Sequence, residues 1–210
     1  SSANHIFDVT AGYSNSSALS GAANTQNAKK INLYNQMAQY LNGYDDSGNI
    51  KGFTMPTNAA AMKEVLFLPF ARLLTKDEVK KGSVTIEWGF SGSNGYYVDS
   101  PAGEYGVLYG TSSNLGAGYA AAVFNDETLG NNATMPAVGL IYYQAGVAVI
   151  SGSLFNDEAD GGVLNDDSTL DSTSLGTAFG ESGFNAITGS TLDNFGNSIL
   201  NRIYNISYNN

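Results

Sequence analysis

The chain has 210 residues, of which 42% are hydrophobic, so it is long enough to bury a core and is not disordered throughout. Its net charge of −10 argues against nucleic acid as a partner, because an acidic surface repels phosphate backbones. The absence of Cys excludes disulfides and thiolate metal ligands and fits a cytoplasmic route of assembly. The longest apolar stretch, 137–150, is too short for a membrane helix, so we expect no membrane partner.

The first segment, residues 1–27, is rich in Ser, Asn, Ala and Gly and has one apolar patch, formed by Ile6, Phe7 and Val9. This is too little apolar surface to order the segment by itself. We therefore predict an extended N-terminal arm that docks on neighbouring subunits, with Ile6, Phe7 and Val9 as its assembly residues.

Residues 28–210 are predicted to form a single β-rich domain that begins with its one main helix, 28–43. Apolar residues follow one another there at three- and four-residue spacing: Ile31, Tyr34, Met37, Ala38 and Leu41. Gly43 stands where a left-handed helix cap belongs. The next stretch, 44–53, predicts a hairpin-type turn centred on Ser47-Gly48-Asn49.

Core strands are predicted over 65–150. The run 65–74 is apolar on both faces, and Pro69 within it indicates an edge strand or a bulge. Thr75 and Glu78 form a capping box, so 75–82 is predicted to be a single-turn helical connector that Gly82 ends. The alternating strand 83–90 follows, with inward residues Val84, Ile86, Trp88 and Phe90.

Further strands are predicted at 105–110, 118–125, 139–143 and 147–151. The last two form a hairpin through the centre of the core, with its turn at Gln144-Ala145-Gly146. Residues 151–190 are a polar, Gly- and Asp-rich loop region, and 201–210 alternate as a final strand. The fold class that follows is mainly β: an antiparallel β-sandwich-like domain with one main α-helix and the extended arm.

Motifs for catalysis are scarce in this sequence. The single His, His5, lies in the arm, so no Ser–His pair is expected in the core. There is no G-x-S-x-G, no P-loop and no dinucleotide-binding glycine motif between a strand and a helix. We therefore expect a protein that is not an enzyme, with no catalytic residues, no cofactor and no metal.

Two surfaces leave alternatives open. A carboxylate cluster over 156–171 offers oxygen ligands that Ca²⁺ prefers, but its spacing fails the EF-hand pattern, and a solvated acidic loop is the favoured interpretation. Its carboxylates are Asp157, Glu158, Asp160, Asp166, Asp167 and Asp171. A glycan-cleaving enzyme is supported by this cluster alone. The 13 tyrosines also suit a carbohydrate platform, although packing within the strands is favoured for Tyr96, Tyr97, Tyr105, Tyr109, Tyr142 and Tyr143.

Patches covering about half of the chain resemble virion structural proteins of large contractile-tailed bacteriophages, particularly T4-like marine and cyanobacterial ones. The first is Thr75-Lys76-Asp77-Glu78-Val79-Lys80-Lys81-Gly82-Ser83, which is similar to K-D-x-[IV]-K-x-G-[ST] before an alternating strand. The second is Tyr142–Ile150, which is similar to a Y-x-x-A-G-[IV]-x-V-[IL] hairpin. "IFDVTAGYS" and "NRIYNISYNN" also resemble stretches around these elements.

This resemblance implies a non-enzymatic structural component of a bacteriophage tail, baseplate or neck, with other virion proteins and copies of itself as partners. The motifs are structural connectors, so the resemblance supplies no catalytic residues. Such proteins continue beyond the equivalent of Asn210, which is compatible with an N-terminal part of a longer protein. The alternative, from another class, is a host-surface or carbohydrate-binding module of a tail fibre.

Overall fold

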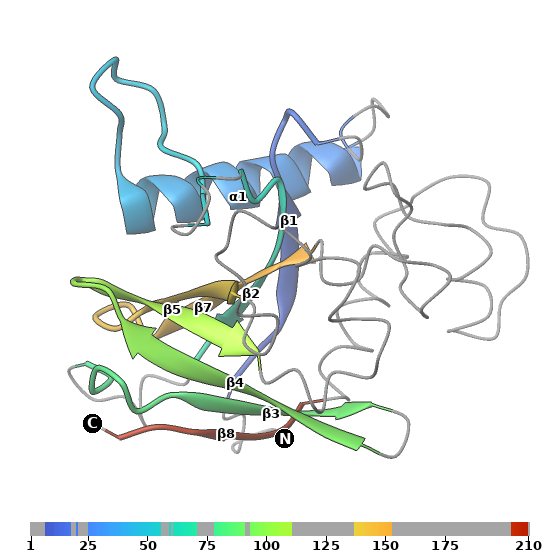
Figure 1. Ribbon diagram of the computed structural model, residues 1–210. Helices are drawn as coiled ribbons and strands as arrows, with labels where there is room; N and C mark the ends of the chain where they lie inside the picture. The colour runs from blue at the N-terminus through green and yellow to red at the C-terminus, as the bar shows by residue number, and fades with distance from the viewer. Residues whose placement is uncertain are drawn as a thin grey trace, which may run out of the picture.

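The computed structural model describes residues 7–17, 20, 25–55, 59, 61–70, 78–90, 93–110, 137–152 and 203–209. Within these residues the protein is mainly β, as the sequence predicts: one curled antiparallel sheet of eight strands, a half-barrel, and a single helix (Figure 1). The helix is α1 (Thr25–Asn42). The strands are β1 (Thr10–Tyr13), β2 (Glu64–Pro69), β3 (Thr85–Phe90), β4 (Ser93–Pro101), β5 (Tyr105–Gly110), β6 (Ala137–Tyr142), β7 (Val147–Ser151) and β8 (Ile203–Ser207).

The strand order is β1-β2-β7-β6-β5-β4-β3-β8, and every pair of neighbours is antiparallel. The consecutive strands β3, β4, β5, β6 and β7 follow one another in the sheet. Strand β8, which lies far along the chain, pairs with β3, and β7 pairs with β2. The predicted hairpin of β6 and β7 is confirmed in the middle of the sheet, where every residue of both strands is buried. Gly146 ends its turn with a φ of 63°, a conformation that favours glycine.

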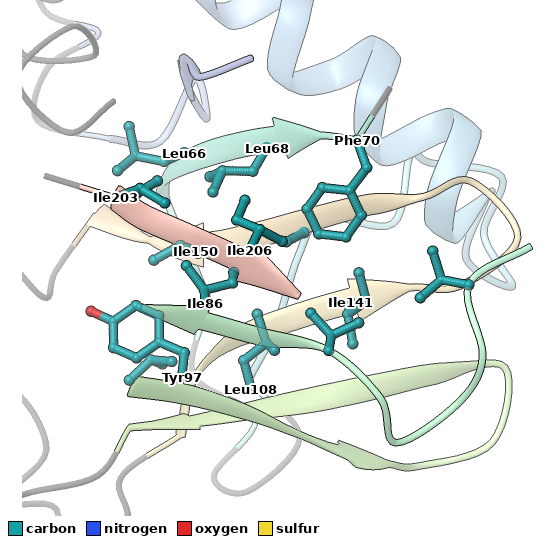
Figure 2. Close-up of a cluster of buried hydrophobic side chains, with 14 of the residues drawn as sticks. Leu66, Leu68, Phe70, Ile86, Tyr97, Leu108, Ile141, Ile150, Ile203 and Ile206 are labelled. Carbon is teal, nitrogen blue, oxygen red and sulfur yellow. The ribbon is translucent and has the colours of Figure 1, made fainter. Parts of the chain in front are cut away.

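Residues on the concave face of the sheet form the inner core (Figure 2). It draws on all eight strands, including Leu66, Leu68, Ile86, Leu108, Ile141, Ile150, Ile203 and Ile206. Because the sheet curls, its two ends contact each other across this core: the ring of Phe70, just after β2, stacks on that of Tyr208, just after β8, at 5.2 Å. One curled sheet thus encloses a core between its own halves.

The outer core lies on the other face of the sheet, between its strands and α1 with the segment that follows the helix. Alternation along β2 and β7 explains the division, since Val65, Phe67, Val147 and Val149 face outward while their neighbours face the inner core. Tyr34 of α1 fixes this layer: its hydroxyl donates to the Met62 carbonyl at 2.9 Å and accepts from the Phe53 N–H at 3.2 Å.

Both ends of α1 can be compared with the prediction. The helix begins at Thr25, ahead of the predicted residue 28, because polar residues before the first apolar position give no periodic signal. Gly43 caps it with a φ of 71° and donates to the Gln39 carbonyl, as predicted. The turn at 47–49 is also confirmed: an Asp45 carboxylate oxygen accepts from the Ser47 and Asn49 N–H groups.

Part of the predicted arm belongs to the sheet. Thr10–Tyr13 form β1, which pairs with β2, and Ala11 and Tyr13 are buried in the inner core. Gly12 permits this close packing, because a Cβ at that position would lie 2.9 Å from a ring carbon of Phe67. These four residues are extended, and they form an edge strand of their own domain.

Three predicted details in the region between β2 and β4 have different outcomes. Pro69 lies neither in an edge strand nor at a bulge, because β2 runs between β1 and β7; it is tolerated as the last residue of the strand. Val84 and Ile86 are buried, as predicted, and Gly82 has a φ of 76°. The capping residue Thr75, the side chains of Trp88 and Phe90, the strand 118–125 and the loop region beyond Gly152 lie outside the described residues.

Candidate functional site

The predicted assembly patch lies beside the inner core. Phe7 forms an antiparallel bridge with Phe70, and Phe7 and Val9 are both half-buried against the inner core. The Asp8 N–H donates to the Pro69 carbonyl at 3.2 Å, which keeps this stretch on the edge of β2. Ile6 lies outside the described residues. Phe7 and Val9 therefore dock on their own domain, and their contact with a neighbouring subunit stays a prediction.

A second surface was not anticipated from the sequence. Tyr40, Tyr44 and Ile50 are the large hydrophobic residues that stand exposed among the described residues, and their exposed fractions are 72%, 57% and 37%. We name them the tyrosine surface. Tyr40 lies in the last turn of α1, and Tyr44 and Ile50 pair across the following turn. The Gln39 amide donates to the Tyr44 hydroxyl at 2.5 Å, so a polar group also faces this surface.

The six tyrosines weighed as a carbohydrate platform do not form one exposed surface. Tyr97, Tyr142 and Tyr143 are buried, and Tyr96, Tyr105 and Tyr109 are half-buried. Tyr142 donates to the side-chain carbonyl oxygen of Asn42 at 2.6 Å, which ties the end of α1 to β6. Packing within and beside the strands, the interpretation favoured from the sequence, accounts for these residues.

A buried carboxylate, that of Asp99 in β4, is held by two donors from distant segments. The Tyr143 hydroxyl donates to it at 2.7 Å and the Gly82 N–H at 2.8 Å. The Lys81 ammonium lies 5.9 Å from the centre of the Tyr143 ring and 3.9 Å from Glu104. Burial, and then the hydrogen bond to Asp99, raise the pKa of Tyr143, so the phenol stays protonated as a donor. The arrangement fastens the connector that contains Gly82 to the centre of the sheet.

Among the residues that the structure describes, a second buried carboxylate is that of Glu64, at the start of β2. The Ser17 hydroxyl donates to its Oε1. Burial raises the pKa of Glu64. The hydrogen bond from Ser17 and the charge of Lys63 lower this pKa by a smaller amount, so the net shift is upward. The pair ties the segment after β1 to the beginning of β2.

Replacement of Glu64 by Gln should stabilise the protein at neutral pH. Glu64 has an ordinary pKa of 4.5 when unfolded and a raised one when folded, so folding binds a proton between these values. Stability is therefore lost as the pH rises through that window, and a neutral amide avoids the loss. Urea unfolding should give Glu64→Gln a higher free energy of unfolding at pH 7 and a smaller gain below pH 4.5.

The matched control is Glu104→Gln, because the Glu104 side chain is 85% exposed and its pairing with Lys81 is that of a surface ion pair. We expect this variant to stay within about 0.5 kcal/mol of the wild type at both pH values. A Glu64→Gln protein that is less stable than the wild type at pH 7 would contradict the prediction.

The part of the chain that the structure describes holds no group of three or more His, Cys, Asp or Glu side chains that could bind a metal ion. The carboxylate cluster of 156–171 lies outside those residues, so the Ca²⁺ alternative stays a prediction. Among the described residues, no helix has both the length and the apolar character needed to cross a bilayer. Comparison with protein-family models, curated proteins and solved structures finds no match.

Proposed function

We propose that this chain is a non-enzymatic structural component of a bacteriophage particle, located in the tail, baseplate or neck and acting through protein–protein assembly contacts. The likeness of 75–83 and 142–150 to virion structural proteins supports the lineage. The observation that supports a non-enzymatic role is that the buried carboxylates of the described residues accept hydrogen bonds that join segments of the fold. Glu64 and Asp99 both accept hydrogen bonds from segments that they hold in place, as groups with a structural role do.

The edge of the sheet supports the assembly part of the proposal. Phe7 and Val9 lie along β2 at the edge that β1 forms, half-buried and held mainly by one neighbouring strand. A short apolar segment on a sheet edge can pair equally well with the same edge of a neighbouring subunit. Multiple copies in a particle then add avidity to each weak contact.

Immunogold electron microscopy of purified particles tests the location. An antibody raised against the chain should label the tail, baseplate or neck of particles of the phage that encodes it, and pre-immune serum should not. Label confined to the capsid would contradict the location. No label on either intact or detergent-disrupted particles would contradict the virion role.

The alternative, a host-surface or carbohydrate-binding module, is favoured by one observation, the exposure of Tyr40 and Tyr44 in the tyrosine surface. Tyrosine rings offer sugars an apolar face together with a polar edge. A glycan array probed with the intact chain would show binding that Tyr40→Ala and Tyr44→Ala each weaken. Silence of the wild-type chain on the array would remove this alternative.

A further inference from the structure

We propose that β8 is an exchangeable strand: in assemblies of this protein it leaves its own β3 and pairs with β3 of a second copy of the chain. The inference deepens the proposed assembly role, on which its biological purpose rests, by naming the partner and the strand that the partner contributes. Each sheet is then completed by its neighbour. The geometry that supports this lies in the position, the contacts and the connection of β8.

The position of β8 makes it separable. It is the last strand of the sheet, opposite β1, and its ladder is made with β3 alone (Figure 1). Removing it opens one ladder and leaves the order of the other seven strands unchanged. Beyond that ladder its C-terminal end is held by Asn209, whose carbonyl accepts from the Lys80 N–H at 2.7 Å and whose N–H donates to the Ser83 hydroxyl at 3.0 Å.

The contacts of β8 select an identical strand as its replacement. Ile203 and Ile206 are buried in the inner core with Leu66, Leu68 and Ile86 (Figure 2). Without β8 these neighbours would lose part of their apolar cover, which is unfavourable in water. A register irregularity opposite Glu87 and Trp88 brings both isoleucines, three residues apart, to the same face. The β8 strand of a second copy has the same sequence, so its isoleucines can fill the same positions in the inner core.

The connection and the charge of β8 allow it to pair with a second copy of the chain. Residues 152–202 separate β7 from β8 in sequence. At about 3.3 Å per residue in an extended chain, a connection of this length is long enough to reach a neighbouring subunit. The chain carries a net charge of −10, but the only charged residue in 201–210 is Arg202, so β8 meets no strong repulsion on the neighbour.

Engineered cysteines test the exchange directly, because the native chain has none. Thr85 and Ser207 are partners across the β3–β8 ladder, close enough for a disulfide. Two single variants, Thr85→Cys and Ser207→Cys, are unfolded together, refolded as a mixture at high concentration and oxidised. A covalent dimer linked between residues 85 and 207, identified by mass spectrometry of the peptides, forms when β8 of one chain pairs with β3 of another.

The control mixture pairs Thr85→Cys with Ser47→Cys, since Ser47 is exposed in the turn after α1 and measures random collision. We expect the 85–207 dimer to exceed the 85–47 dimer by about tenfold or more, as pairing raises the local concentration. Equal yields would overturn the proposal. The double variant Thr85→Cys/Ser207→Cys, at low concentration, should give a cross-linked monomer; failure to cross-link would show that the ladder itself is absent and would also overturn the proposal. Neither result depends on whether antibody labels a particle.

Discussion

Gly139→Ala should destabilise the protein by about 2–4 kcal/mol, because it forces atoms against the backbone of a neighbouring strand in a tightly packed part of the sheet. Gly139 lies in β6 directly opposite Ile150 of β7. A Cβ added there would lie 2.3 Å from the backbone carbonyl oxygen of Val149 and 3.0 Å from the Cα of Ile150. Both are backbone atoms at the centre of the sheet, so no side-chain rotation can relieve the contact. The hairpin must separate or change register.

Urea and thermal unfolding measure this effect. For a chain of this size each 1 kcal/mol corresponds to a fall in Tm of about 2–4 °C, so the variant should melt roughly 4–16 °C below the wild type. Gly43→Ala is the matched control: a Cβ there has open space, and a φ of 71° leaves a backbone cost of about 1–2 kcal/mol. A Gly139→Ala protein that is as stable as Gly43→Ala would contradict the expected close packing of β6 on β7.

The parts of the fold that the sequence predicts well carry a strong local pattern. The apolar runs 139–143 and 147–151, with a turn signal between them, predict a hairpin through the centre of the core, and β6 and β7 confirm it. The helix and the glycine turns at Gly43, Gly48 and Gly82 also follow from local rules, since each glycine has a positive φ. The pattern of neighbouring residues determines these elements, so they can be predicted from the sequence alone.

The parts that escaped prediction depend on pairing between distant segments. The sequence predicts no strand over 93–101, because Ser, Asn, Gly, Asp and Pro dominate these residues, yet they form β4, which pairs with β3 on one edge and with β5 on the other. Strand β1 is short and gains its order from β2. Side chains of a regular strand alternate between the two faces of the sheet. The irregular pairing of β8 with β3 interrupts this alternation, so Ile203 and Ile206, three residues apart, both lie in the inner core. The residues within each of these segments carry no pattern that predicts this pairing.

For the candidate surfaces too, the sequence predicts what a local pattern shows and misses what depends on distant segments. Phe7 and Val9 stand out in a polar segment, so the sequence identifies them, but it cannot say that they lie against Phe70. Tyr40 and Tyr44 were missed because tyrosines near a helix end are equally common in cores and on surfaces. The signal that existed is that Tyr40 falls outside the apolar stripe of Tyr34, Met37, Ala38 and Leu41.

The link between Asp99 and Tyr143 joins residues far apart in the sequence, and its removal is the second large effect that we expect. Asp99→Ala leaves the buried Tyr143 hydroxyl without its acceptor, and it also removes the acceptor of the N–H of Gly82, an exposed residue. A buried group that loses its partner costs about 1–3 kcal/mol and a lost hydrogen bond at an exposed residue about 0.5–1.5 kcal/mol, so the variant should lose about 3 kcal/mol in the free energy of unfolding. Tyr143→Phe removes one donor from a charged group and should cost about 1.5–3 kcal/mol.

The double variant decides whether the two residues act as a unit. If they do, Asp99→Ala and Tyr143→Phe together should cost at least about 1 kcal/mol less than the sum of the single losses. Asp46→Ala, an exposed residue in the turn after α1, is the control and should stay within about 0.5 kcal/mol of the wild type. Strict additivity of the two losses would mean that the buried hydrogen bond contributes nothing of its own. The connector at Gly82 would then be held by its other contacts, which include the hydrogen bond from the Val79 N–H to the Tyr143 carbonyl and the packing of Val79 and Val84 in the inner core.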